Sequence, residues 1–163
     1  MNQLDIDAVA AQLGRRPRGT HAVAHRCPCG NPDVVETSPR LDDGTPFPTL
    51  YYLTCPYATA ACSRLESAGV MRDMQERLST DPVLAQRYRR AHEDYLKRRE
   101  AVEHVPQIEG VTAGGMPDRV KCLHVHLAHA LAVGAGVNPF GDEVRDAVGP
   151  WWTGGACVPR GEE

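Results

Sequence analysis

The sequence predicts a single α+β domain over residues 1–163, in which helices cover a small, mostly antiparallel sheet formed by the N-terminal third. Three short segments of that third, 20–26, 34–37 and 49–54, alternate in polarity or are rich in β-branched and aromatic residues, as is typical of strands. Beyond residue 56, apolar residues recur three and four positions apart, which indicates helices. A chain of 163 residues is long enough for one domain with its own core, and we find no internal repeat.

The predicted helices begin and end at residues that favour helix termini. A first helix over 4–13 ends before Gly14, and a second begins at Pro56, directly after a strand, and runs to residue 68 before Gly69. The remaining helices are expected over 70–78, 81–103, 119–133 and 139–148. Asp81-Pro82 and Asn138-Pro139 are typical helix starts, and Gly134 ends the helix over 119–133.

Two segments lack a periodic pattern. Residues 105–118 are rich in proline and glycine and are expected to form a flexible loop. Residues 149–163 form a C-terminal tail, which Trp151 and Trp152 are expected to dock on the body of the protein, because the order of a terminus has to be offset by burial. Docking would also return Cys157 to the body.

The composition argues against several classes of protein. A net charge of −3 and a pI of about 6.2 do not suit nucleic-acid binding, which requires a basic surface. No apolar run approaches the roughly 20 residues that cross a bilayer, and the N-terminus lacks the basic and then apolar pattern of a secretory signal. We therefore expect a cytoplasmic protein that binds neither a membrane nor a nucleic acid.

Six cysteines are the main indication of function. Disulfides are rare in a reducing compartment, so a group of thiols there more often indicates metal binding or catalysis. Cys62 lies about two helical turns beyond Cys55 and is expected in the core, whereas the role of Cys29 stays open. The candidate metal ligands are therefore Cys27, Cys55, Cys122 and Cys157.

The fold could gather these distant thiols at one edge of the sheet. Cys27 and Cys55 each follow a predicted strand, so they would meet if strands 20–26 and 49–54 were neighbours. Cys122, at the start of a helix packed on the sheet, would add a third ligand, and Cys157 or His126 a fourth. Because the cysteines are dispersed rather than paired, we favour an iron–sulfur cluster, for example 4Fe-4S, over zinc.

The segment 120–129 concentrates one thiol and three imidazoles in a predicted helix. At helical spacing Cys122, His126 and His129 share a face, and His124 points elsewhere. His126 is therefore the reserve ligand, and His124 is expected to support the ligands or to face a substrate. The alternative interpretation is a small apolar cysteine in a buried stripe, with histidines satisfied by hydrogen bonds.

Two other functions fit the same residues. Cys55 lies where a helix N-terminus would lower its pKa and favour a thiolate nucleophile, with His92, His124 or His126 as the base of a metal-free enzyme. Alternatively, the thiols are buried or hold a structural zinc, and the charged helix 81–103 binds a protein partner. Neither a Ser/His/Asp hydrolase motif nor a phosphate-binding glycine loop is present.

The chain contains a series of short motifs: Cys27-Pro28-x-Gly30, Pro39-x-Leu41-x-x-Gly44-Thr45-Pro46-Phe47-Pro48-Thr49-x-Tyr51, Leu53-Thr54-Cys55-Pro56, Val120-Lys121-Cys122-Leu123-His124-x-His126 and Asn138-Pro139. Together these motifs resemble a family of small actinobacterial proteins, the domain of unknown function 501 (DUF501) family. The family has no settled activity, so the resemblance implies no particular reaction. It does imply that Cys27, Cys55, Cys122 and Cys157 belong to the family pattern, whereas Cys29 occupies a variable position.

Overall fold

A computed structural model describes residues 1–162 of the chain. Strands β1 (Thr20–Arg26), β2 (Pro32–Thr37) and β3 (Tyr51–Leu53) form an antiparallel sheet in the order β1-β2-β3. The predicted α+β class, with its sheet in the N-terminal third, is confirmed. The assumption that strands 20–26 and 49–54 are adjacent in the sheet is wrong, because β2 pairs with both and lies between them.

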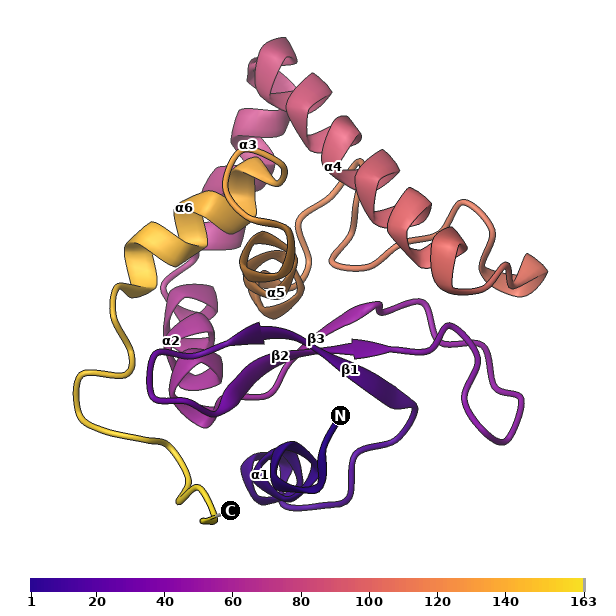
Figure 1. The fold of residues 1–163 in the computed structure, drawn as a ribbon. Helices are drawn as coiled ribbons and strands as arrows, with labels where there is room; N and C mark the ends of the chain where they lie inside the picture. The colour runs from indigo at the N-terminus through magenta and orange to yellow at the C-terminus, as the bar shows by residue number, and fades with distance from the viewer. Residues whose placement is uncertain (163) are drawn as a thin grey trace.

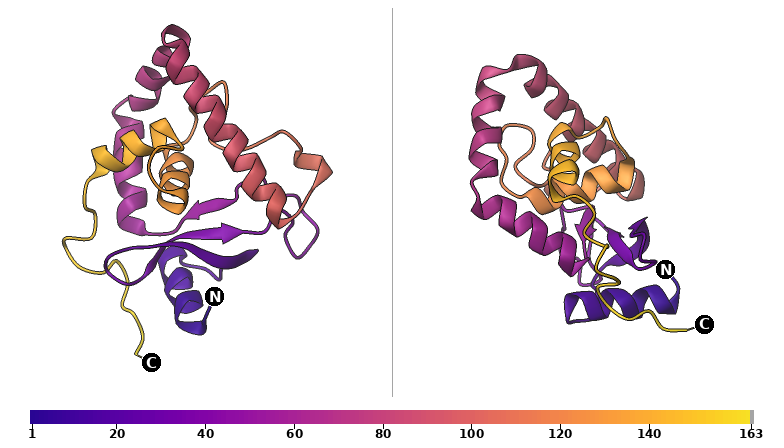
Figure 2. Two further views of the ribbon diagram at one scale, coloured as in Figure 1. Left: turned by 45° about the horizontal axis from the view of Figure 1, so that its top comes forward. Right: turned by 90° about the vertical axis from the view of Figure 1, so that its left-hand side faces the viewer.

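Helices cover both faces of the sheet (Figure 1). Helix α1 packs on one face, and α5 lies across the opposite face with the other helices around it, as both views in Figure 2 also show. Within the described chain, none of the helices combines the length and the apolar character that a membrane crossing requires. The helical elements are α1 (Gln3–Leu13), α2 (Pro56–Ser67), α3 (Val70–Thr80), α4 (Pro82–Val102), the 3-10 turn η1 (Pro106–Ile108), α5 (Leu123–Val133) and α6 (Pro139–Val148).

Strand alternation gives the sheet two different faces. Val34 and its partner Leu53 point toward α5 and belong to the main core. Val35 and its partner Tyr52 therefore point to the opposite face, where α1 packs. Only part of that second face is covered, since Tyr52 keeps 37% of its surface exposed.

Helix α5 is the centre of the helical layer. Seven of its residues are buried, which suits a helix that is apolar nearly all round and packs against neighbours on several sides. Helix α6 crosses it at close range at Gly141, where a Cβ atom would collide with the carbonyl of His126 and approach the Cβ of Ala130 to 2.8 Å. Glycine is therefore required at position 141 by the close approach of the two helices.

The amide of Asn138 satisfies two fully buried histidines of α5. Its Nδ2 donates to Nδ1 of His126 at 3.0 Å and to Nδ1 of His129 at 3.2 Å. Both rings must then carry their proton on Nε2. In His126 this N–H donates to the Gly114 carbonyl, and in His129 it donates to the Asp94 carboxylate. Burial lowers the pKa of His126 to about 4, so this ring is neutral.

Helix α5 begins at Leu123, not at Arg119 as predicted. The preceding residues are not helical, because the amide of Val120 donates to the Gln75 side chain and the amide of Lys121 donates to the Gly114 carbonyl. Cys122 is consequently the N-cap, with φ −153° and ψ 110°. Its side chain does not share the helix face of His126, which corrects the predicted grouping of these two residues.

Helix α4 confirms the predicted long helix, and one of its charged side chains lies in the core. Arg99 is buried, and its guanidinium donates to the carbonyls of Pro48 and Ile108, both at 2.8 Å. Arg99 thereby connects α4 to the segment before β3 and to the 3-10 turn η1. Binding of a partner by this helix stays a prediction, as does flexibility of the loop over residues 105–118.

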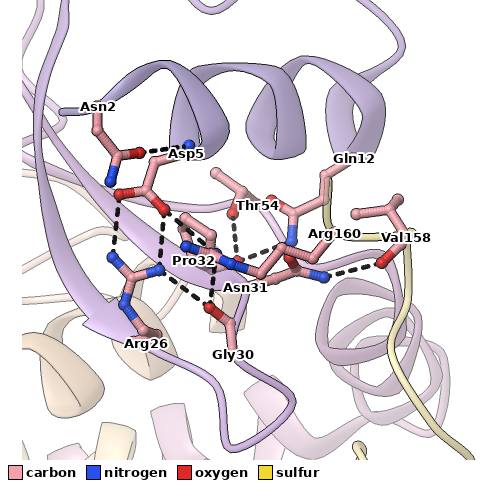
Figure 3. A network of polar contacts seen from close by, with 10 residues as sticks. All are labelled: Asn2, Asp5, Gln12, Arg26, Gly30, Asn31, Pro32, Thr54, Val158 and Arg160. Carbon is pink, nitrogen blue, oxygen red and sulfur yellow. Dashed lines mark hydrogen bonds and ion pairs between the residues drawn. The ribbon is translucent and has the colours of Figure 1, made fainter. Parts of the chain in front are cut away.

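The C-terminal tail returns across the sheet edge to α1, and Figure 3 shows the contacts that hold it. Asn31 donates to the Val158 carbonyl at 2.9 Å, and the Arg160 guanidinium contacts the Gly30 carbonyl at 2.8 Å and Asp5 at 3.3 Å. Trp151 is half-buried and packs against the main core. Polar contacts near residues 157–160 therefore hold the end of the tail, and docking by Trp151 and Trp152 together stays a prediction.

Substitution of Asn138 by alanine should lower the free energy of unfolding by about 2–4 kcal/mol, because it removes a helix cap and leaves two buried imidazole nitrogens without a donor. The matched control is Asn2→Ala, which removes the exposed cap of α1, whose side chain accepts from the Asp5 amide, and should cost about 1 kcal/mol. Urea unfolding followed by circular dichroism measures both. Equal losses for the two variants would contradict the role assigned to Asn138.

Candidate metal centre

The N-terminus of α5 and one face of α2 bring a thiol, an imidazole and a carboxylate together. Cys122 is the N-cap of α5 and His124 lies in its first turn. Glu66 belongs to α2, where Thr59, Ser63 and Glu66 follow one another at intervals of four and three residues and so lie on one helix face. That face is turned toward the start of α5, since His124 contacts residues at all three positions.

The three ligand-type atoms converge at Nδ1 of His124. This nitrogen lies 3.7 Å from Sγ of Cys122 and 2.8 Å from Oε1 of Glu66. Among the residues that the structure describes, these are the three that could hold a metal ion together, with their ligand atoms within 4.8 Å of one another. All three side chains are partly exposed, so the group is accessible from solvent.

The second nitrogen of the His124 ring fixes its orientation. Nε2 lies 3.2 Å from the Thr59 carbonyl and 3.3 Å from the Ser63 hydroxyl. A carbonyl only accepts, so Nε2 carries a proton, and the lone pair of a neutral ring lies on Nδ1, toward Cys122 and Glu66. Metal-binding histidines commonly donate their other N–H to a carbonyl in this way.

The environment favours the charged forms of the Cys122 and His124 pair. Burial alone would raise the pKa of Cys122, but contact with His124 and the backbone N–H groups of Val125 and His124 together lower it below its usual value. The pKa of His124 is raised, first by the Cys122 thiol and further by the charge of Glu66. Both shifts favour a thiolate at Cys122 beside an imidazolium at His124.

A cavity of about 260 Å³ adjoins the group. It runs along β3, which is an edge strand of the sheet, and Cys122 and His124 form part of its wall. The remaining lining residues are mainly apolar or aromatic: Thr49, Tyr51, Tyr52, Leu53, Thr59 and Val125. A molecule in this cavity would therefore lie against the candidate ligands.

The other predicted cysteines form separate groups. Cys55 and Cys157 are neighbours, because the Cys157 side chain contributes, by charge and by hydrogen bonding, to the raised pKa of Cys55. Cys27 lies beside Cys29, whose amide is 3.5 Å from Sγ of Cys27. Two strand spacings, about 10 Å, separate the ends of β1 and β3, so the shared edge of the sheet does not by itself bring Cys27 to Cys55.

Burial changes the expected chemistry of three of these thiols. It raises the pKa of Cys27 to about 11 and the pKa values of Cys55 and Cys62 to about 12. Cys55 is the N-cap of α2, as predicted, and nearby backbone amides do lower its pKa, but burial outweighs them. The predicted Cys55 thiolate is therefore wrong, whereas Cys62 is fully buried and confirms its expected place in the core.

His126 and His129 lie away from Cys122. Both nitrogens of His126 already have protein partners, since Nε2 is 3.1 Å from the Tyr88 hydroxyl and 3.0 Å from the Gly114 carbonyl, and Nδ1 accepts from Asn138. A metal bound to His126 would have to replace one of these contacts. The structure instead supports the interpretation of buried histidines satisfied by hydrogen bonds.

Glu66 is the residue that the sequence analysis missed, and His124 has a more direct place than the supporting one expected. The helical spacing of Cys62 and Glu66, four residues apart on α2, was the available signal. The dispersed set of Cys27, Cys55, Cys122, Cys157 and His126 stays a prediction, within which the structure groups Cys55 with Cys157.

The fold and the site define a small α+β protein with a three-residue candidate metal centre on its helical layer. Residues 23–146 match a family described as "Protein of unknown function (DUF501)". That match covers most of the chain and both α2 and α5, so the chain belongs to the DUF501 family. Comparisons with curated proteins and with solved structures gave no match.

Iodoacetamide at pH 7.5 should alkylate Cys122 well before Cys27, Cys55 and Cys62. The thiolate is the reactive form, and the pKa is lowered at Cys122 but raised at the other three. His124→Gln should slow the reaction at Cys122 and move its pH profile upward, since burial then acts without the imidazolium. Peptide mapping by mass spectrometry measures each site. An exposed histidine substitution, His104→Gln, is the control, and an unchanged profile in His124→Gln would contradict the pairing.

Proposed function

We propose that this DUF501 protein is a metal-binding protein whose centre is a single divalent ion, zinc by preference, held by Glu66, Cys122 and His124. The observation that carries the proposal is the convergence of Sγ, Nδ1 and Oε1 around one point at the start of α5. A thiolate, a neutral imidazole and a carboxylate form a mixed ligand set that suits zinc better than calcium or magnesium.

The observed separations are close to those of a tetrahedral site. Zinc–sulfur bonds of about 2.3 Å and zinc–nitrogen bonds of about 2.0 Å place the two ligand atoms about 3.5 Å apart, and Cys122 and His124 are 3.7 Å apart. The 2.8 Å contact between Glu66 and His124 is a proton-mediated hydrogen bond. An ion that replaced this proton would hold the two atoms about 0.5 Å further apart.

The charges of the ligands balance a divalent ion. A thiolate and a carboxylate contribute two negative charges, and a neutral His124 contributes none, so the occupied centre has no net charge. Because the pKa of His124 is raised, the proton competes with the metal, and binding should weaken as the pH falls below the titration of this ring.

Three protein ligands leave one position of a tetrahedral ion free. Such an open position lets zinc act as a Lewis acid on a water molecule or on a substrate, whereas structural zinc sites usually have four protein ligands. The free position would be next to the cavity along β3, which Cys122 and His124 line. The proposal therefore favours a metal-dependent reaction over a purely structural ion.

The iron–sulfur centre predicted from Cys27, Cys55, Cys122 and Cys157 is a competing proposal for the same protein. It requires the Cys122 thiol to leave the Glu66 and His124 group and join cysteines that lie on other elements. The two proposals share Cys122 but differ in all the other ligands, so variants at the unshared positions distinguish them.

The purified protein should bind one equivalent of zinc in an isothermal titration at pH 7.5. Glu66→Gln and His124→Gln should each weaken binding by about 100-fold or more, because loss of a mere hydrogen-bond partner of a ligand already costs about 10–100-fold, and Cys122→Ser should weaken it further. Cys157→Ser and Cys27→Ser are the matched controls, because they remove thiols that the proposed zinc centre does not use. Circular dichroism checks that each variant is folded.

Elemental analysis of the anaerobically purified protein distinguishes the zinc centre from the iron–sulfur centre. Stoichiometric zinc that is lost in the Glu66 and His124 variants, but kept in the Cys157 variant, supports the proposal. Iron with sulfide and a visible charge-transfer band, lost on substitution of Cys27 or Cys157, would support the iron–sulfur centre instead. Neither metal, with no heat of zinc binding, would contradict both and leave the reactive Cys122 thiol as the functional group.

A further inference from the structure

A second cavity, of about 360 Å³, lies on the face of the sheet that carries α1. Its walls come from the end of α1, the loop of residues 15–18, strands β1 to β3 and the loop of residues 41–47. The centre of β2 forms the floor, where Val35 is 1% exposed and Thr37 is 2% exposed. The floor is therefore part of the folded sheet rather than a gap between mobile loops.

The body of this cavity is apolar. Val35, Tyr52, Leu41 and Phe47 supply aliphatic and aromatic surface, and the last three are only partly buried by the protein itself. Helix α1 covers the neighbouring part of the same face (Figure 1). A volume of 360 Å³ is at the lower end of the range typical of small-molecule sites, about 300–1,000 Å³.

Two arginines, Arg15 and Arg18, also line the cavity, and none of the lining residues within the described chain is acidic. The Arg15 guanidinium makes one long contact, 3.5 Å, to the carbonyl of Arg16. Arg18 approaches the exposed Asp43 at 3.5 Å, and both side chains are more than half exposed. Among the described residues Arg15 has no carboxylate partner, and Asp43 engages only one nitrogen of Arg18 at 3.5 Å, so both guanidinium groups keep donors available for a ligand.

The local backbone keeps these arginines beside the apolar floor. Gly19 has φ +65°, and a Cβ atom there would lie 2.5 Å from Cδ2 of Leu41. Glycine thus lets the arginine loop turn and pack directly on the cavity wall. The carbonyl of Gly19 also accepts from the amide of Ser38, which joins the loop to the end of β2.

We propose that this cavity binds a small amphipathic anion, with an acyl chain or ring against the partly exposed rings of Phe47 and Tyr52 and a carboxylate or phosphate head between Arg15 and Arg18. Apolar burial supplies the general attraction, and the planar guanidinium forks suit the head group in particular. The site is distinct from the candidate metal centre in ligand type and position. Tyr52 is the lining residue that both cavities share.

Titration of ¹⁵N-labelled protein with decanoate, decyl phosphate and 1-decanol tests the proposal. Decanoate or decyl phosphate should shift amides of residues 13–20, 35–37 and 41–47 in a saturable way, with 1-decanol at least tenfold weaker. The stronger of the two anions identifies the head group. Arg15→Gln combined with Arg18→Gln should weaken the anion by at least tenfold and leave the alcohol unchanged, because two charge-assisted hydrogen bonds are lost.

The matched control combines Arg72→Gln with Arg90→Gln, which removes the same charge from two exposed arginines of α3 and α4. This control should bind both anions like the parent protein. Leu41→Trp, which fills the cavity from its rim, should reduce binding of anions and alcohol alike. Equal affinity for decanoate and 1-decanol in the parent, equal losses in the two double variants, or shifts that do not saturate would each overturn the proposal.

Discussion

The contact on which the helical layer depends is the bridge from Asn138 to two histidines of α5. Buried polar groups are stable only when they have hydrogen-bond partners, and this one amide supplies a donor to each ring while its oxygen accepts from the Gly141 amide to cap α6. The same side chain therefore sets the rotation of α5, the tautomers of both rings and the start of α6. A helix with imidazoles on its buried face would otherwise be unfavourable in a core.

The placement of α5 in turn places the candidate metal centre. Once the rings of His126 and His129 are held in the core, the first turn of the helix has to present Cys122 and His124 toward α2. Glu66 and the Thr59 carbonyl meet them there. Histidines of one short segment thus have two functions: those in the middle of α5 support the core, and the one in its first turn, His124, is a candidate ligand.

Local sequence signals predicted most of the fold, because each depends on neighbouring residues. The strands, the Pro56, Asp81 and Asn138 helix starts and the buried Cys62 all follow from alternation, capping or helical spacing. The candidate site was predicted only in part. Which strand lies in the middle of the sheet depends on long-range pairing, and the insertion of β2 between β1 and β3 removed the reason to bring Cys27 and Cys55 together.

The missed members of the site have a similar physical cause. Glu66 lies one helical turn beyond Cys62 in the sequence, but it becomes a candidate ligand through the packing of α2 on the start of α5. The late start of α5 also depends on distant partners, since Gln75 and Gly114 accept hydrogen bonds from the amides of Val120 and Lys121. A helical spacing rule applied from Arg119 therefore grouped Cys122 with the wrong histidine.

X-ray absorption at the zinc edge of the zinc-loaded protein tests the identity of the centre most directly, because it counts the sulfur atoms around the ion. One sulfur at about 2.3 Å, with the remaining ligands nitrogen or oxygen at about 2.0–2.2 Å, is the result expected for Glu66, Cys122 and His124. Three or four sulfur atoms in the first shell would contradict that centre and favour the dispersed cysteines.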